Sequence, residues 1–200
     1  MYTGKHAHLR PLQPAFIMAA TGETVTYREL EARCNRLAHL LRKLGLQRLD
    51  HYAIFMENNS RYLEACGAGE RSGLYYTCVN SYLTPGELAY IVNNSESRVL
   101  VTSAAKLDVA REALNKCPKI ELCIVADGGS ESERIVGLCE VTAGLPKTRS
   151  RTNPSAPRCS IRRAPPAGRK AYCALWRSNR RRSSCLCSIF SIKSGGTAKA

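Results

Sequence analysis

The chain has 200 residues, enough for one domain with a buried core or for part of a larger one. Its hydrophobic fraction of 44% is ordinary for a soluble protein, and no apolar run approaches the ~20 residues of a membrane span. Residues 1–8 lack the apolar core of a secretory signal. These features argue against a membrane-spanning or secreted protein and predict a cytoplasmic one.

The net charge of +14 is concentrated in the last quarter of the chain. Residues 148–200 contain 13 of the 30 Lys and Arg residues and no Asp or Glu, whereas residues 1–147 contain 17 basic and 16 acidic residues. The tail is also rich in Ser and Pro and shows no helical or strand period. We therefore predict an ordinary folded domain at residues 1–147, followed by a disordered basic tail at residues 148–200.

The cysteines and histidines form no recognisable metal or redox motif. The ten cysteines include no CxxC pair, and Cys117/Cys123 and Cys185/Cys187 lack a zinc spacing. Because no secretory signal is present, we interpret the thiols as buried or incidental rather than as disulfides. The four histidines are scattered, and we interpret them as structural or exposed: His6, His8, His39 and His51. We expect no metal site.

A capping box predicts where the first helix of the domain begins. A short apolar segment at residues 14–17 precedes a turn near Gly22, and then Thr26 and Glu29 fit a capping box. Apolar residues follow at helical spacing: Leu30, Cys34, Leu37, Ala38, Leu41 and Leu44. Gly45 is a natural C-terminal stop. The pattern predicts an amphipathic helix covering a sheet.

The next elements alternate between strand and helix. Residues 52–56 and 75–79 read as buried strands. Between them, residues 58–60 can cap a helix that starts near Arg61 and runs to Gly73. This helix is rich in small residues, which would permit close packing on the sheet: Ala65, Gly67, Ala68 and Gly69.

The alternation continues in the second half of the domain. Thr84 and Glu87 repeat the capping box with Pro85 at the first helical position, and the helix should end at residues 93–94. A strand at residues 98–102 and a helix capped by Ser103 follow. A last strand at residues 120–125 closes at the turn of residues 127–129.

Strands that alternate with helices indicate an α/β fold, with a mostly parallel sheet and helices on both faces. By about Leu145 the chain has built roughly half of a doubly wound domain, which we expect to leave an open strand edge and an uncovered face. Residues 1–147 contain no Gly-rich phosphate loop, no Ser/His/Asp set and no paired carboxylates at a readable spacing. We therefore assign no catalytic, cofactor-binding or metal-binding residue in this part.

The order and spacing of residues 12–127 resemble the N-terminal part of AMP-forming acyl-CoA synthetases, with the fatty-acyl and long-chain branch as the best fit. The matching positions are Thr26-Tyr27-x-x-Leu30, Asn35-Arg36-Leu37-Ala38, Leu41, Gly45, Asn58, Arg71-Ser72-Gly73-Leu74-Tyr75-Tyr76, Val79-Asn80, Leu83-Thr84 and Glu87-Leu88. One departure is Leu49-Asp50, where the family usually has Gly-Asp. The resemblance implies a ligase that adenylates a fatty acid with ATP and Mg²⁺ and then transfers the acyl group to coenzyme A.

The family has its ATP loop, Ser-Ser-Gly-Thr-Thr-Gly-x-x-x-Gly, soon after the point reached at Leu145, because small residues let backbone N–H groups approach phosphate oxygens. The stretch from Ile161 to Ala171 is not that loop as written. Read from the third base of each codon, however, it can encode Ser-Ser-Gly-Thr-Thr-Gly followed by a further Gly four positions on. Our hypothesis is that residues 148–200 are an off-frame translation, caused by a one-base deletion or an equivalent insertion near codon 147.

Three interpretations follow. In the first, the chain is an N-terminal ligase fragment that is itself inactive, since no ATP, Mg²⁺ or coenzyme A would bind productively without the loop. In the second, it is a non-catalytic protein whose basic tail binds nucleic acid or acidic surfaces. Arg180–Arg182 would contact phosphates beside Trp176, and the binding would not be specific for one nucleic-acid sequence. In the third, it is a stable non-catalytic module.

Overall fold

The computed structural model describes residues 3–149, and residues 150–200 of the predicted basic tail lie outside this range. The strands are β1 (Pro14–Ile17), β2 (Thr24–Thr26), β3 (His51–Phe55), β4 (Tyr75–Val79), β5 (Val99–Thr102), β6 (Leu122–Val125) and β7 (Ile135–Gly137). The helices are α1 (Gly4–Leu9), α2 (Tyr27–Lys43), α3 (Tyr62–Ser72), α4 (Pro85–Asn94), α5 (Leu107–Leu114) and α6 (Leu138–Thr142), with a 3₁₀ turn at Ala104–Lys106. None of these helices is long and apolar enough to cross a bilayer.

Five strands form one parallel sheet in the order β4-β3-β5-β6-β7. Ala53 of β3 stands opposite Thr77 of β4 and Leu100 of β5, so the two neighbours of β3 are in direct register with it. The separate β1–β2 pair is antiparallel. The predicted α/β class and parallel sheet are therefore confirmed.

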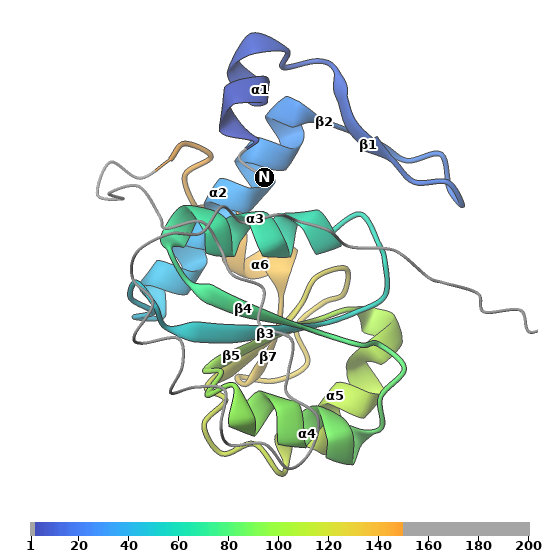
Figure 1. Cartoon of the computed structure of the whole chain (residues 1–200), viewed down its shortest axis with the longest axis vertical. Coiled ribbons are helices and arrows are strands. Elements are labelled where there is room, and N and C mark those ends of the chain that lie inside the picture. The colour runs from blue at the N-terminus through green and yellow to red at the C-terminus, as the bar shows by residue number, and fades with distance from the viewer. Residues whose placement is uncertain (1–2, 150–200) are drawn as a thin grey trace, which may run out of the picture. The chain divides into compact units, whose positions relative to one another are not determined.

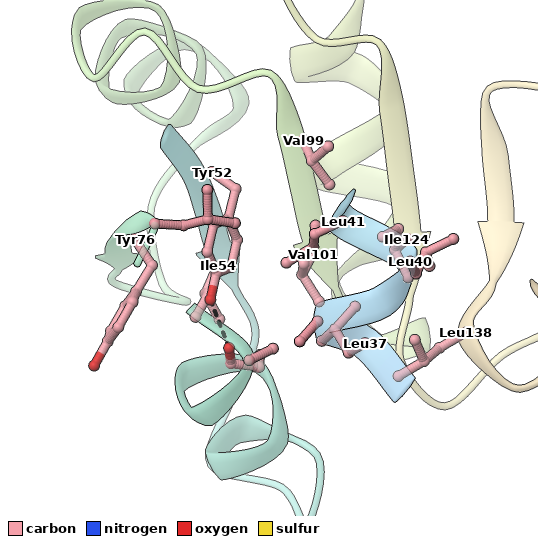
Figure 2. Close-up of a cluster of buried hydrophobic side chains, with 14 of the residues drawn as sticks. Leu37, Leu40, Leu41, Tyr52, Ile54, Tyr76, Val99, Val101, Ile124 and Leu138 are labelled. Carbon is pink, nitrogen blue, oxygen red and sulfur yellow. Dashed lines mark hydrogen bonds between the residues drawn. The ribbon is translucent and has the colours of Figure 1, made fainter. Parts of the chain in front are cut away.

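Helices cover both faces of the sheet (Figure 1). Alternate residues of β3 point to opposite sides: Tyr52 and Ile54 join the core beneath α2, α3 and α6, whereas Ala53 and Phe55 join the core beneath α4 and α5. The first of these cores, with its Leu, Val and Ile side chains packed between α2 and the sheet, is shown in Figure 2. The expectation of an uncovered face is wrong for the described residues, because each face has its own helices.

Both predicted capping boxes are present. Thr26 accepts a hydrogen bond from the backbone N–H of Glu29, and the Glu29 carboxylate accepts in return from the backbone N–H of Thr26 at 2.9 Å. The same pair of bonds joins Thr84 and Glu87 at the start of α4. Gly45 follows α2 with a φ of +78°, a left-handed conformation that favours glycine at a helix end.

Two predicted caps were wrong in detail. Helix α3 begins at Tyr62, one residue after the expected start, and no side chain caps it, although Asn59 Oδ1 accepts from the Arg61 N–H at 3.0 Å. Ser103 makes no capping bond either, because its hydroxyl donates to Glu57 Oε2 at 2.5 Å. Asp127 supplies an acceptor in its place, 2.7 Å from the Ala104 N–H.

The small residues of α3 allow the close approach that was predicted for them. A Cβ on Gly69 would lie 2.5 Å from the Tyr52 hydroxyl and 2.7 Å from Tyr76 Cδ1, so this glycine lets the helix lie against two buried rings of the sheet. A Cβ on Gly67 would lie 2.6 Å from Cys34 Sγ, which places this glycine against α2 instead. The Tyr52 hydroxyl donates to the Ala65 carbonyl at 2.6 Å and ties the strand to the helix.

Candidate functional site

A partly open hollow lies between α2, α3 and α6, and three arginines line it. Its volume is about 320 Å³. The lining residues are Arg33, Arg36, Arg61, Glu64, Leu138, Cys139, Thr142 and Ala143. We refer to this hollow as the arginine pocket.

Helix periodicity explains why two arginines of α2 line the same pocket. Arg33 and Arg36 are three residues apart, so they lie on the same side of the helix, next to the apolar stripe that faces the sheet. Both are half-buried because α3 and α6 pack beside them. Arg33 Nη1 lies 3.9 Å from Glu23 Oε1, which is an ion pair too long for a hydrogen bond.

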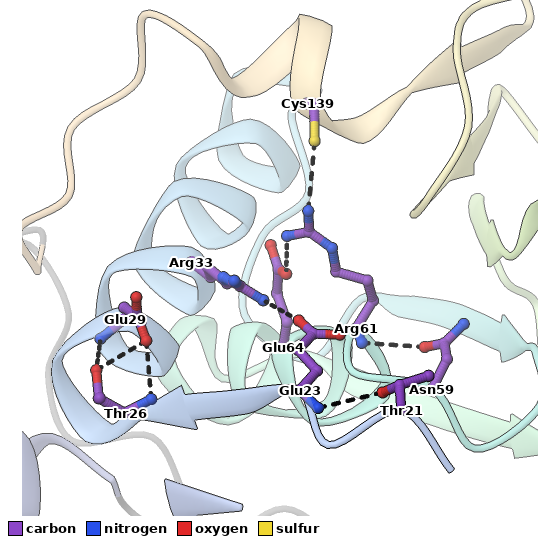
Figure 3. Close-up of polar contacts among 9 residues, drawn as sticks. All are labelled: Thr21, Glu23, Thr26, Glu29, Arg33, Asn59, Arg61, Glu64 and Cys139. Carbon is purple, nitrogen blue, oxygen red and sulfur yellow. Dashed lines mark hydrogen bonds and ion pairs between the residues drawn. The ribbon is translucent and has the colours of Figure 1, made fainter. Parts of the chain in front are cut away.

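The third arginine is held by a buried carboxylate. Arg61 Nη1 donates to Glu64 Oε2 at 2.9 Å, and Arg61 Nη2 donates to Cys139 Sγ of α6 at 3.5 Å (Figure 3). Burial raises the pKa of the Glu64 carboxyl above its usual value, and the neighbouring charges of Arg61, Arg33 and Arg36 offset only part of this effect. Burial alone would lower the pKa of Arg61, but the Glu64 carboxylate outweighs it, so the pKa is raised.

Two guanidinium nitrogens of the pocket have no hydrogen-bond partner. Arg33 Nη1 and Arg36 Nε are both buried, and neither donates to any atom of the described chain. Buried polar groups without a partner are uncommon in folded proteins. The positive charges of Arg33 and Arg36 are therefore balanced by no hydrogen-bonded carboxylate within the described residues.

A second group of polar residues lies at the carboxyl ends of the parallel strands, where open α/β sheets usually bind ligands. Here Glu57, after β3, accepts from Ser103, after β5, and from Asn59 at 3.2 Å. Burial alone would raise the pKa of Glu57. Its hydrogen bonds with Ser103, its own backbone and Asn59 together have the larger, opposite effect, so the pKa lies below its usual value. The side chains of these residues are hydrogen-bonded to one another, and they do not form a reactive centre.

The thiols and imidazoles of the described residues do not form such a centre either. Cys34 and Cys123 are buried, which raises the pKa of each thiol to about 12. Cys78 differs: its pKa is lowered to about 7, mainly because Cys66 bonds to it. His51 Nδ1 contacts the Ser95 carbonyl at 2.5 Å, and the other histidines are exposed or contact the backbone or a ring. In residues 3–149, no three His, Cys, Asp or Glu residues are grouped to hold a metal ion.

The arginine pocket was missed by the sequence analysis. Helix α6, which was not predicted, supplies residues to the wall of the pocket beside Arg33 and Arg36. Its five residues, Leu138–Thr142, are too few to show a helical period. The predicted ATP loop, from Ile161 to Ala171, lies outside the described residues.

The comparisons with known proteins agree on one family. A family model described as "AMP-binding enzyme" matches residues 4–159. A 3-oxocholest-4-en-26-oate–CoA ligase of Rhodococcus rhodochrous is 32% identical over 114 residues, which are 57% of this chain and 20% of that protein. The 4-coumarate–CoA ligase 2 of Oryza sativa subsp. japonica is 30% identical over 117 residues, which are 58% of this chain and 20% of that protein.

The fold has the same relatives among solved structures. The anthranilate CoA ligase AuaEII, solved with anthranoyl-AMP, superposes with a TM-score of 0.69 at 17% identity, covering 77% of this chain and 29% of that one. A putative long-chain-fatty-acid CoA ligase from Rhodopseudomonas palustris gives a TM-score of 0.64 at 25% identity, covering 72% of this chain and 36% of that one. The chain spans about a fifth of the length of the curated relatives that it matches.

Proposed function

Because this chain belongs to the AMP-binding enzyme family, we propose that it is the N-terminal part of an acyl-CoA ligase that activates a fatty acid with ATP and transfers it to coenzyme A. The observation that supports this most is the family match over residues 4–159, on a parallel sheet with helices on both faces. The relatives are named for steroid, aromatic and fatty acids, all of them carboxylic acids. The fatty-acid assignment rests on the residue pattern of the long-chain branch.

The described residues supply the scaffold in this proposal. ATP would need a loop of small residues at its phosphates, and no such loop occurs among residues 3–149. The arginine pocket, at about 320 Å³, is at the lower end of the size range of ligand pockets. We therefore place the binding of ATP, Mg²⁺ and coenzyme A outside the described residues and derive no step through them.

The proposal includes the loss of activity in the chain as written. Off-frame translation of residues 148–200 replaces the Ser-Ser-Gly-Thr-Thr-Gly loop by Arg- and Pro-rich sequence from Ile161 to Ala171. Proline has no N–H to donate, and the bulky arginines would keep the backbone away from the phosphates. The chain should therefore not form an acyl-adenylate.

The test compares two proteins by the exchange of labelled pyrophosphate into ATP in the presence of a series of fatty acids. The first protein is the chain as written. The second is expressed from the same gene with the reading frame corrected near codon 147 and followed to its natural stop. We expect no exchange with the first and fatty-acid-dependent exchange with the second. Exchange by the chain as written would overturn the proposed inactivity, and a corrected protein with no exchange would overturn the ligase assignment.

A second candidate function is supported by the charge of the tail. Residues 148–200 carry 13 Lys and Arg residues and no acidic residue, which is sufficient for binding to nucleic acid or an acidic surface. Titration of the chain with single-stranded oligonucleotides of several sequences at two salt concentrations distinguishes a function from an incidental attraction. Sequence preference that survives the higher salt would support this function. Equal, salt-sensitive binding to every sequence would refute it.

A further inference from the structure

The arginine pocket contains guanidinium groups that lack a close hydrogen-bond acceptor. Arg61 is neutralised by Glu64, which it contacts at 2.9 Å, whereas Arg33 has only the long ion pair with Glu23 at 3.9 Å. Arg36 makes no ion pair with any residue of the described chain, and its Nε is buried without a partner. Two of the three guanidinium groups therefore lack a close acceptor.

The charge balance of the pocket favours an anion. Its lining contains three arginines and one acidic residue, Glu64, so the wall carries a net positive charge. Glu23 lies nearby with nearly half of its side chain exposed, where water screens its charge. The guanidinium groups of Arg33 and Arg36 are half-buried and have no hydrogen-bonded carboxylate, so an anion bound between them would supply the missing negative charge.

Size and geometry narrow the class of anion. A volume of about 320 Å³ suits a small ligand, and a planar guanidinium matches the oxygens of a phosphate or carboxylate. A tetrahedral oxyanion offers oxygens in several directions, so it can bond with more than one arginine of the pocket at once. A planar carboxylate has only two oxygens and would reach fewer of them.

We propose that the arginine pocket between α2, α3 and α6 is a binding site for a phosphate group, held by Arg33 and Arg36. Thr142 and Cys139 of α6 also line the pocket. The test measures the binding of phosphate itself, so its outcome does not depend on the activity of the proposed ligase.

The experiment is calorimetric titration of the complete 200-residue chain with inorganic phosphate, at constant ionic strength set with chloride. Arg36→Gln should weaken binding by about ten- to a hundredfold, the loss expected for a hydrogen bond to a charged group. The matched control is Arg28→Gln, which removes the same charge from the exposed side of the same helix and should leave the affinity unchanged. Far-ultraviolet circular dichroism of both variants checks that the fold is intact.

A second pair of variants keeps every arginine. Ala143 lines the pocket and is exposed, so its side chain can be extended without disturbing the core. Ala143→Glu adds a competing carboxylate and should abolish phosphate binding, whereas Ala143→Gln, of similar size, should retain it. This pair gives an answer even if Arg36→Gln does not fold.

The outcomes are decisive in both directions. Arg36-dependent binding of phosphate supports the site, and tighter Arg36-dependent binding of pyrophosphate supports it too and indicates that the phosphate group belongs to a longer ligand. Equal binding by the native chain, Arg36→Gln, Arg28→Gln and Ala143→Glu would attribute the heat to the basic tail and overturn the proposal. The absence of any binding by the folded native chain would also overturn it.

Discussion

The glycine at position 69 gives the sharpest test of how α3 packs on the sheet. In Gly69→Ala the new Cβ would lie 2.5 Å from the Tyr52 hydroxyl and 2.7 Å from Tyr76 Cδ1, well inside van der Waals contact. Neither ring has room to move, because Tyr52 is 0% and Tyr76 is 3% exposed. The hydroxyl of Tyr52 is also fixed by its hydrogen bond to the Ala65 carbonyl.

The magnitude follows from three effects. Overpacking of a buried site costs about 1–3 kcal/mol. Distortion of the Tyr52 hydrogen bond costs about 1 kcal/mol more, while alanine regains about 1 kcal/mol over glycine inside a helix. We therefore expect Gly69→Ala to lower the free energy of unfolding by about 1–3 kcal/mol, which is a shift of several degrees in Tm for a domain of this size.

The matched control is Gly86→Ala, in the first turn of α4, where a Cβ would meet nothing within 4 Å. Gly86→Ala should leave the free energy of unfolding unchanged or raise it by up to about 1 kcal/mol, because alanine favours a helix more than glycine does. Urea denaturation of the 200-residue chain, followed by circular dichroism, measures both variants. Equal stabilities for Gly69→Ala and Gly86→Ala would refute the packing argument.

A double-mutant cycle locates the clash. Tyr52→Phe removes the oxygen that the new Cβ would approach most closely, so Gly69→Ala should cost less in the Tyr52→Phe background than in the native one. Additive effects of the two substitutions would place the clash elsewhere.

Three further outcomes are expected. Glu31→Gln removes the carboxylate that pairs with the guanidinium of Arg71, whose side chain is only 3% exposed. The free energy of unfolding, measured by urea denaturation, should fall by about 3 kcal/mol. An unchanged midpoint would contradict a structural role for this ion pair. Glu87 has a pKa below its usual 4.5, because it accepts hydrogen bonds from the N-cap backbone N–H and hydroxyl, so its stabilising contribution is complete above pH 4.5 and is lost as the pH falls through the lowered value. Glu87→Gln should therefore lose less stability on acidification than the native chain, and identical pH profiles would refute this. Native-state alkylation by iodoacetamide should modify the exposed Cys139 and spare the buried Cys34, whose pKa is raised to about 12; the reverse order by peptide mass spectrometry would contradict the described core.

The sequence was informative where one physical signal dominates a local segment. The capping boxes at Thr26 and Thr84 give two helix starts, because a hydroxyl and a carboxylate three residues apart satisfy the free backbone donors there. The buried strands appear as short apolar runs, since both faces of a parallel sheet are covered. Elements of only a few residues, such as β2, β7 and α6, were not predicted, because they are too short to show a period.

The candidate site depended on contacts that no local pattern contains. Arg33 and Arg61 are 28 positions apart and come together only when α2 and α3 pack side by side beneath α6. The cap predicted for Ser103 failed for a similar reason: Glu57, from another strand end, is the stronger partner of its hydroxyl, and Asp127 takes the vacant capping role. Competition between partners from different elements decides such cases, and it is set by the tertiary structure.

The family assignment and the frame hypothesis both predict features of the DNA that encodes this chain, and one measurement tests both. Resequencing the coding DNA across the codons for residues 140–200, and onward through the bases that follow, would settle the reading frame. We predict a one-base change near codon 147 whose correction restores Ser-Ser-Gly-Thr-Thr-Gly in place of the residues from Ile161 to Ala171 and leaves an open ligase frame downstream. A frame that is confirmed as written, with no such loop in the shifted reading, would contradict the account.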